Sequence, residues 1–372
     1  MEYEESTRVT VISITVIIIV GIVGNLLNIY VFSHKSMRKN TTFRYLFYLS
    51  IIDLLVLLVA TVDALFTFGF FIMIRANSNF LCKTHTFMTY LLTQMSSNIL
   101  MIVSIDRALI ICNKKLYVSI KNFLKEQKFL KIDWYNSKRV GKLVLTVLIL
   151  LGIFNSHYLI FMKLNEAESR NLVPSEKMKK AYRISENNSM YINSSYNYNN
   201  TNYKSPIENI QSKRDGLVCF PSSTSLYNHF LLEIWVWFDL VIYSIIPFTV
   251  MIICSIIIVL EIRSKSSSFI TTSKNNKSAC EKAKRRNKKM LIMLVVTNLY
   301  FIFCSLPLGA DIIHYKFKAA EYEPHFLQSF FHILAYTNNS ANIFFYILFS
   351  HKYRQILFSI FYRFKRTRTE TI

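Results

Sequence analysis

Acidic residues, glycine and proline are all scarce in this chain. Its 372 residues include 22 Asp and Glu against 44 Lys and Arg, and only 7 Gly and 6 Pro. The sequence contains no Gly-rich phosphate-binding loop, no HExxH motif and no Ser-centred nucleophile elbow. We therefore predict that the protein is not an enzyme and needs no organic cofactor.

Long apolar runs, in contrast, are abundant. Hydrophobic residues make up 52% of the chain, and several runs exceed the roughly 20 residues that cross a hydrocarbon core of about 30 Å. They lie at about 8 to 33, 44 to 74, 81 to 112, 139 to 162, 230 to 261, 290 to 315 and 325 to 349. The first run follows the acidic stretch "MEYEESTR" and no small-residue cleavage site follows it, so we expect a retained helix. The predicted fold class is an all-α membrane protein, a seven-transmembrane helix bundle.

The excess of positive charge is confined to one set of loops. The segments 34–44, 106–142, 261–289 and 351–372 hold 30 of the 44 Lys and Arg but only 6 of the 22 acids. Basic loops face the cytoplasm in membrane proteins. We expect a multi-pass protein of the plasma membrane, with its N-terminus outside and its C-terminus cytoplasmic. Because topology alone requires these basic loops, we expect no nucleic-acid partner.

The chain divides into a predicted seven-transmembrane domain at 1–350 and a predicted tail at 351–372. The domain has a long outer loop at 163–229 and inner loops at 113–138 and 262–289. The inner loop 113–138 is either an amphipathic surface helix or a solvated basic loop. Apolar residues in the tail recur at helical spacing, which predicts a short amphipathic helix against membrane lipid; they are Tyr353, Ile356, Leu357, Ile360, Phe361 and Phe364.

Two modifications are predicted on the outer side. Of the six cysteines, only Cys82 and Cys219 fall there, so they form the one plausible disulfide in an oxidising exterior. Asn187, Asn193 and Asn199 each begin an Asn-x-Ser/Thr acceptor in the outer loop. Glycosylation is permitted at all three, while chance matches also arise in such an Asn-rich run.

Several residues within the apolar runs resemble the signature of one family. They are Gly24-Asn25, Leu49 to Asp53, Cys82, Asp106-Arg107, Pro247, Phe301, Cys304-x-x-Pro307 and Asn342 to Tyr346. In order and spacing, this set resembles the rhodopsin-like (class A) G-protein-coupled receptors over residues 20 to 364. The stretch "GNLLNIYVFSHKSMRKNTTFRYLFYLSIIDLLVLL" looks like invertebrate neuropeptide receptors of the FMRFamide-like kind.

The resemblance implies roles for residues near the cytoplasmic side. Asp106 is expected to hold Arg107 at rest, and Arg107, together with Tyr346, is expected to couple to a heterotrimeric G protein. A conformational switch is expected deeper in the bundle, at Phe301, Cys304, Pro307 and Asn342.

The resemblance also implies a sodium site. Asp53, Ser96, Asn338 and Asn342 match the polar cluster that holds this ion in the family. Carboxylate, hydroxyl and amide oxygens suit a hard cation. The alternative is a hydrogen-bond network between helices without an ion.

Departures from the family pattern concern the switch. Asn287 lies where many relatives have an acid at the foot of the sixth helix, and Ser305 replaces the usual Trp. Ser255 replaces an activation Tyr, Ile343 replaces a Pro, and Ala108 replaces the Tyr after Arg107. We expect a weaker resting clamp on Arg107 and a raised basal activity.

The outer half of the bundle indicates the kind of ligand. Thr89 lies where amine receptors of this family have an Asp, and residues 325 to 349 lack the Lys of opsins. The candidate ligand-binding residues are acidic, aromatic or polar: Asp63, Thr89, Tyr90, Asp239, Asp311 and His332. Carboxylates complement Arg or Lys, which favours a basic, amidated neuropeptide. Alternatively, Asp63 and Asp239 only bond helices to each other.

Two other functions stay open at this point. A small-molecule chemoreceptor would use the same fold and the same coupling residues. A transporter is less favoured because transporters show inverted repeats and Gly/Pro-broken helices, whereas this chain has 7 Gly, 6 Pro and no visible repeat.

Overall fold

The computed structural model describes residues 2–70, 72–111, 140–166, 217–221, 226–267, 277–317 and 325–359. Within these ranges the chain is almost entirely helical, with one two-stranded sheet. The inner loop 113–138, the acceptors Asn187, Asn193 and Asn199, and the tail beyond residue 359 lie outside the described residues. The expectations for these segments therefore stay predictions.

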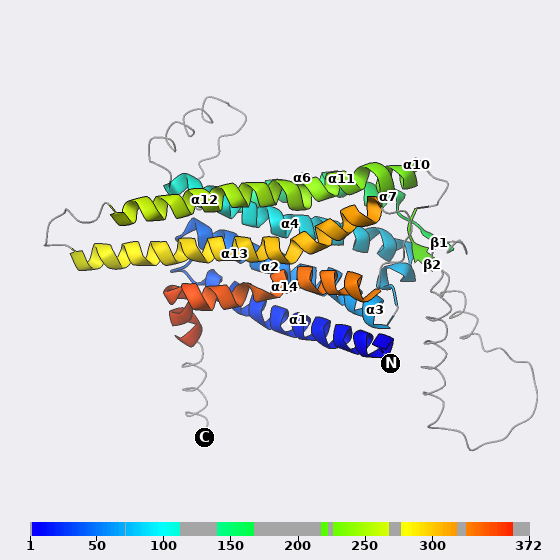
Figure 1. Cartoon of the computed structure of the whole chain (residues 1–372), viewed down its shortest axis with the longest axis horizontal. Helices are drawn as coiled ribbons and strands as arrows, with labels where there is room; N and C mark the ends of the chain where they lie inside the picture. Colours follow the sequence, from blue (N-terminus) through cyan, green and yellow to red (C-terminus); the bar gives the residue numbers. More distant parts are fainter. Residues whose placement is uncertain are drawn as a thin grey trace, which may run out of the picture.

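Seven helical rods pack side by side into one bundle (Figure 1). In chain order they are α1 (Glu2–Ser33); α2 (Thr41–Val56) with η1 (Leu57–Thr61) and α3 (Val62–Phe70); α4 (Asn79–Ile111); α6 (Val140–Asn155) with α7 (His157–Phe161); α10 (Leu226–His229) with η4 (Phe230–Trp235), α11 (Val236–Leu240), η5 (Val241–Ile245) and α12 (Ile246–Ser267); α13 (Lys277–Phe317); and α14 (His325–Phe349). α4 contacts α2, α6, α12 and α13, while α14 packs against α1 and α13. The predicted seven-helix fold is confirmed.

The surface of the bundle is suited to lipid. Six of the rods are long and apolar enough to cross a membrane, and large apolar side chains such as Ile19 and Ile153 are 59% and 67% exposed. The seventh rod, α14, is more polar, but its polar residues at 338–340 and 342 are buried. Helices that hide their polar groups and expose apolar ones satisfy the requirements of a hydrocarbon environment. The chain is a multi-pass membrane protein.

The two ends of the bundle carry different structures. The start of α1 and the strands β1 (Leu164–Glu166) and β2 (Leu217–Cys219) lie at one end, and the chain leaves α14 at the other (Figure 1). β1 and β2 are antiparallel, with Leu164 opposite Cys219. A disulfide joins Cys219 to Cys82 in the first turns of α4, with 5.4 Å between their Cα atoms. The predicted disulfide is confirmed.

Residues 351–359 form a short helix directly after α14. Tyr353 and Leu357 are buried, while Lys352 and Gln355 are exposed, so the predicted amphipathic pattern holds in the part described. Burial raises the pKa of the Tyr353 hydroxyl, which stays protonated and donates to Asn28 Oδ1 at 2.6 Å. The helix is thereby fixed to α1.

Glycine allows α1 to approach α14 closely. A Cβ atom on Gly24 would lie 3.0 Å from Ile343 Cγ2, and one on Gly21 would lie 2.9 Å from Ser340 Cβ. The contact at Gly21 is shorter than real Cβ atoms make, and the one at Gly24 would require Ile343 to shift, so two of the seven glycines in the chain serve helix packing.

Three π-helical segments interrupt the rods in the half of the bundle nearest the sheet. η1 lies between α2 and α3, while η4 and η5 flank the five-residue helix α11. Such segments are rare and frequently occur at functional sites. Asp63 follows η1 by two residues, and Asp239 lies between η4 and η5. Both acids predicted to contact ligand are thus next to irregular helical turns.

Candidate functional site

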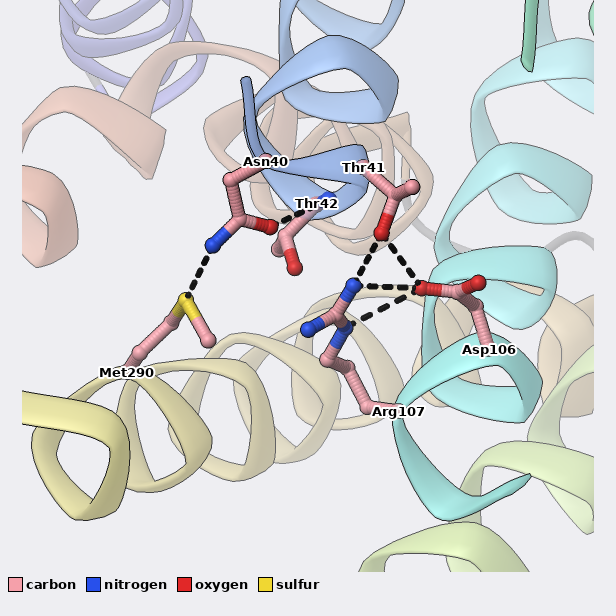
Figure 2. Close-up of polar contacts among 6 residues, drawn as sticks. All are labelled: Asn40, Thr41, Thr42, Asp106, Arg107 and Met290. Carbon is pink, nitrogen blue, oxygen red and sulfur yellow. Dashed lines mark hydrogen bonds and ion pairs between the residues drawn. The ribbon is translucent and has the colours of Figure 1, made fainter. Parts of the chain in front are cut away.

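The Asp106–Arg107 pair lies at the C-terminal end of α4 and is buried. Arg107 Nη2 and Nε donate to Asp106 Oδ2 at 2.6 and 3.1 Å. Arg107 Nη2 also donates to Thr41 Oγ1, and Thr41 Oγ1 donates to Asp106 Oδ2 at 3.1 Å. The guanidinium therefore lies between Asp106 and the start of α2 (Figure 2). Thr41 completes a closed three-residue network that holds Arg107 inside the bundle.

The start of α2 is itself fixed by Asn40, the N-cap residue. Its Oδ1 accepts the backbone N–H of Thr42 at 3.0 Å, which satisfies one of the free donors of the first helical turn. Its Nδ2 points to Met290 Sδ on α13 at 3.6 Å (Figure 2). Asn40 thus connects the turn that carries Thr41 to α13, the helix whose expected acid is missing. The side chain of Asn287 lies outside the described residues.

A second polar cluster surrounds Asp53 in the middle of the bundle. Ser96 Oγ and Asn342 Nδ2 donate to its two carboxylate oxygens at 2.7 and 2.8 Å. Ser96 also reaches Asn339 Oδ1 at 3.4 Å. Asn338 is buried but makes no side-chain hydrogen bond to a described residue. Of the four predicted sodium ligands, the structure joins three directly.

The composition of this cluster fits a sodium ion. The Oδ1 atoms of Asn338 and Asn342 are buried acceptors without a hydrogen-bond partner among the described residues. Unpaired buried acceptors are costly, and a hard cation binds oxygen atoms of this kind. Asp53, Ser96, Asn338 and Asn342 would hold the ion, and it would supply positive charge beside the Asp53 carboxylate. The sodium site stays a prediction.

The predicted switch residues line α13 and α14. Phe301 and Cys304 are buried, and Phe301 packs edge-on against Phe248 with 5.4 Å between ring centroids. Pro307 lies inside α13, where the missing backbone donor is expected to kink a helix. α13 curves along its length in Figure 1. Cys304 Sγ lies 3.4 Å from Thr337 Oγ1 of α14, so the two helices meet at this level.

One switch contact involves Ser255, the residue that replaces the expected Tyr. Asn298 Nδ2 of α13 donates to Ser104 Oγ of α4 at 2.8 Å and to Ser255 Oγ of α12 at 3.2 Å. All three side chains are buried. A single amide therefore joins three rods.

Tyr346 is enclosed by aromatic rings near the end of α14. Its ring centroid lies 5.1 Å from that of Phe32 and 5.8 Å from that of Tyr353. Its hydroxyl has no hydrogen-bond partner among the described residues. In this conformation Tyr346 supports the joint between α1, α14 and the helix at 351–359, and its predicted part in coupling stays a prediction.

The candidate ligand residues are spread over the end of the bundle that carries the sheet. Asp63 Oδ2 lies 3.9 Å from Arg75 Nη1 in η2 (Ile74–Asn77). Tyr90 stacks on Tyr158 of α7 with 4.6 Å between centroids, and Asp239 accepts Gln94 Nε2 at 2.8 Å. The remaining three are partly buried: Thr89, Asp311 and His332. His332 packs against Phe68, with 5.1 Å between ring centroids.

Sequence reasoning found two neutral partners of Asp53, Ser96 and Asn342, through the family resemblance, but missed the neutral partners in the other networks. Thr41 and Asn298 join helices in the half of the bundle near Arg107, while Gln94 and Asn155 do so in the half that carries the sheet. A buried Thr, Asn or Gln within an apolar run is a detectable polar feature, but its partner depends on the packing of distant helices. These four residues lie outside the family signature, so the resemblance did not single them out.

Comparison with known families supports the receptor resemblance. The family model described as 7 transmembrane receptor (rhodopsin family) matches residues 200–346, which is less than half of the chain. The match runs from the outer loop through α13 and nearly to the end of α14, so it includes Phe301, Cys304, Pro307 and Asn342 but not Asp106 or Arg107. A comparison with curated proteins found no match.

Proposed function

We propose that this protein is a G-protein-coupled receptor that binds an extracellular ligand and activates a heterotrimeric G protein through Arg107. The observation that carries the proposal is the buried network of Arg107, Asp106 and Thr41 at the end of α4. Pairing with an acid lowers the free-energy cost of burying an arginine in a membrane helix. A buried charge of this kind marks a functional position. The rhodopsin-family match to residues 200–346 adds support from a different part of the chain.

The network gives the proposal a mechanism. In the conformation described, the Arg107 side chain is 7% exposed, and its guanidinium is directed to Asp106 and Thr41. A partner can reach it only after the start of α2, or α13 beyond it, moves away. Ligand binding at the outer end would favour that open state if the ligand binds it more tightly than the closed state. A cytoplasmic G protein would then stabilise the exposed arginine.

We further propose that the ligand is a basic neuropeptide. Asp63 and Asp239 place carboxylates near the outer end of the bundle, and a carboxylate pairs strongly with a desolvated Arg or Lys. A small-molecule chemoreceptor is the second candidate, because the same acids would accept a small organic cation. A transporter would leave the Arg107 network without a role.

Nucleotide exchange tests the receptor proposal. Purified protein in lipid nanodiscs would be mixed with each of the main classes of G protein, and GDP release would be measured with and without a panel of amidated peptides. We expect exchange above that of empty nanodiscs, and its loss in Arg107→Leu. Ligand uptake into vesicles without any exchange would identify a transporter instead.

A further inference from the structure

The two outer acids, Asp63 and Asp239, differ in whether a positively charged side chain lies beside the carboxylate. Asp63 faces the guanidinium of Arg75 at 3.9 Å. The one described side chain that hydrogen-bonds Asp239 is Gln94, which is neutral. An unopposed carboxylate within a membrane bundle is costly and marks a functional site. Within the described residues, Asp239 is therefore the acid that lacks a cation.

A chain of two hydrogen bonds, from Asn155 to Gln94 and from Gln94 to Asp239, holds the Asp239 carboxylate in place. Asn155 Nδ2 donates to Gln94 Oε1 at 2.7 Å, and Gln94 Nε2 donates to Asp239 Oδ1 at 2.8 Å. Because Asn155 occupies the carbonyl of Gln94, the amide nitrogen of Gln94 is left to point at the carboxylate. Gln94 and Asn155 are fully buried. These two hydrogen bonds fix one oxygen of Asp239 and supply no charge.

The second oxygen of Asp239 remains available. No described residue donates a hydrogen bond to Oδ2, and the side chain is only partly buried. Tyr90 and Tyr243 lie near enough to interact electrostatically with the carboxylate. The π-helical segments η4 and η5 flank the residue on both sides. This local backbone irregularity is a second observation that points to a functional site.

We infer that Asp239, oriented by Gln94 and Asn155, forms a subsite for one guanidinium or ammonium group of the extracellular ligand. The inference rests on the proposed function, in which a ligand reaches the bundle from the outer end. The inference refines the proposed function by assigning the ligand's cation to Asp239 alone. The negative charge of Asp63 is neutralised by Arg75 and is not available to the ligand. The cation pairs with Oδ2 of Asp239.

Two isosteric probes test the subsite directly. Arginine amide carries a guanidinium, whereas citrulline amide has nearly the same shape without the charge. Thermal unfolding of the purified protein in nanodiscs would be measured over a series of concentrations of each probe. We expect arginine amide to raise the midpoint by about 2 to 4 °C near saturation, and citrulline amide to leave it unchanged.

Matched variants assign the effect to Asp239. Asp239→Asn keeps an oxygen acceptor for Gln94 and removes the charge, so the response to arginine amide should disappear. Asp63→Asn should leave the response intact. Gln94→Lys places an ammonium group beside Asp239 and should abolish the response, whereas Gln94→Met, uncharged but without the donor that orients Asp239, should weaken the response without abolishing it.

The outcomes separate this inference from the proposed function. Equal midpoint shifts in wild type and Asp239→Asn, loss of the shift in Asp63→Asn alone, or no shift in wild type would each overturn the subsite. None of these results depends on G-protein exchange. Conversely, a charge-specific shift at Asp239 with no nucleotide exchange would retain the subsite and overturn the receptor proposal.

Discussion

Asn298 of α13 donates a hydrogen bond to Ser104 of α4 at 2.8 Å, although 194 positions separate the two residues. The same amide reaches Ser255 of α12 at 3.2 Å. Ser255 replaces the Tyr expected from the family resemblance, and Ser305 replaces the expected Trp. The chain therefore holds α13 with a buried amide in a region where both aromatic residues are absent.

Removing this amide should raise basal exchange. Hydrogen bonds between membrane helices contribute about 0.6 kcal/mol on average and up to about 1.7. Asn298→Leu should therefore increase unliganded nucleotide exchange by about three- to eighteenfold. The Ser104 hydroxyl would keep a hydrogen bond in this variant, because it also donates to the Leu100 carbonyl at 2.8 Å.

Thr297→Val is the matched control for Asn298→Leu. Thr297 is equally buried, but its hydroxyl bonds only to Met293 of its own helix. Basal exchange should stay at the wild-type value in this variant. An equal rise of basal exchange in both variants would mean that removing any buried polar group from α13 loosens the bundle. That result would contradict a specific role for Asn298.

Sodium should stabilise the protein through Asp53. Unfolding of the purified protein would be followed in sodium chloride and in choline chloride at equal ionic strength. We expect a higher midpoint in sodium, because ligand binding to the folded state alone adds stability. Asp53→Asn should remove the difference, and Asn338→Ala should reduce it, because Asn338 Oδ1 is unpaired among the described residues. The same midpoint in both salts would leave only a hydrogen-bond network.

Loss of the Cys82–Cys219 bridge should lower stability at the end of the bundle that carries the sheet. The bridge closes a loop of 137 positions and joins β2 to α4. Removing a disulfide typically costs about 2 to 5 kcal/mol. Cys82→Ser with Cys219→Ser should unfold at a lower temperature than wild type and should not respond to reducing agent, whereas Cys254→Ala, which changes a free buried thiol, should keep the wild-type response. Identical responses of wild type to oxidised and reduced buffer would contradict the prediction.

The fold was predictable because each rod is a long apolar run, and length and hydropathy are local properties of the sequence. The disulfide was predictable because topology leaves two cysteines on the outer side. The N-terminal ends of α1 and α13 were harder to predict. Both helices begin before their apolar runs, at Glu2 and at Lys277. Polar residues continue a helix at these ends, so hydropathy does not mark the boundary.

The sites were predictable for the charged residues and, through the family resemblance, for Ser96 and Asn342 beside Asp53. Asp53, Asp106 and Arg107 are rare enough inside apolar runs to draw attention on sequence grounds. The other neutral partners depend on which helix faces meet, and that is decided by packing across the bundle. Asp63 and Asp239 were equivalent in the sequence, and only the position of Arg75 separates them.

The central claim is that the closed network around Arg107 restrains coupling to a G protein. Thr41→Val removes the hydroxyl that bonds Arg107 and Asp106, while Thr42→Val changes the next residue, whose buried hydroxyl has no partner among the described residues. The most direct measurement is unliganded GDP release by these two variants, each with and without Arg107→Leu. The account predicts a rise in Thr41→Val alone and its loss when Arg107→Leu is added. Exchange that equals that of empty nanodiscs in every variant, or that survives Arg107→Leu, would contradict it.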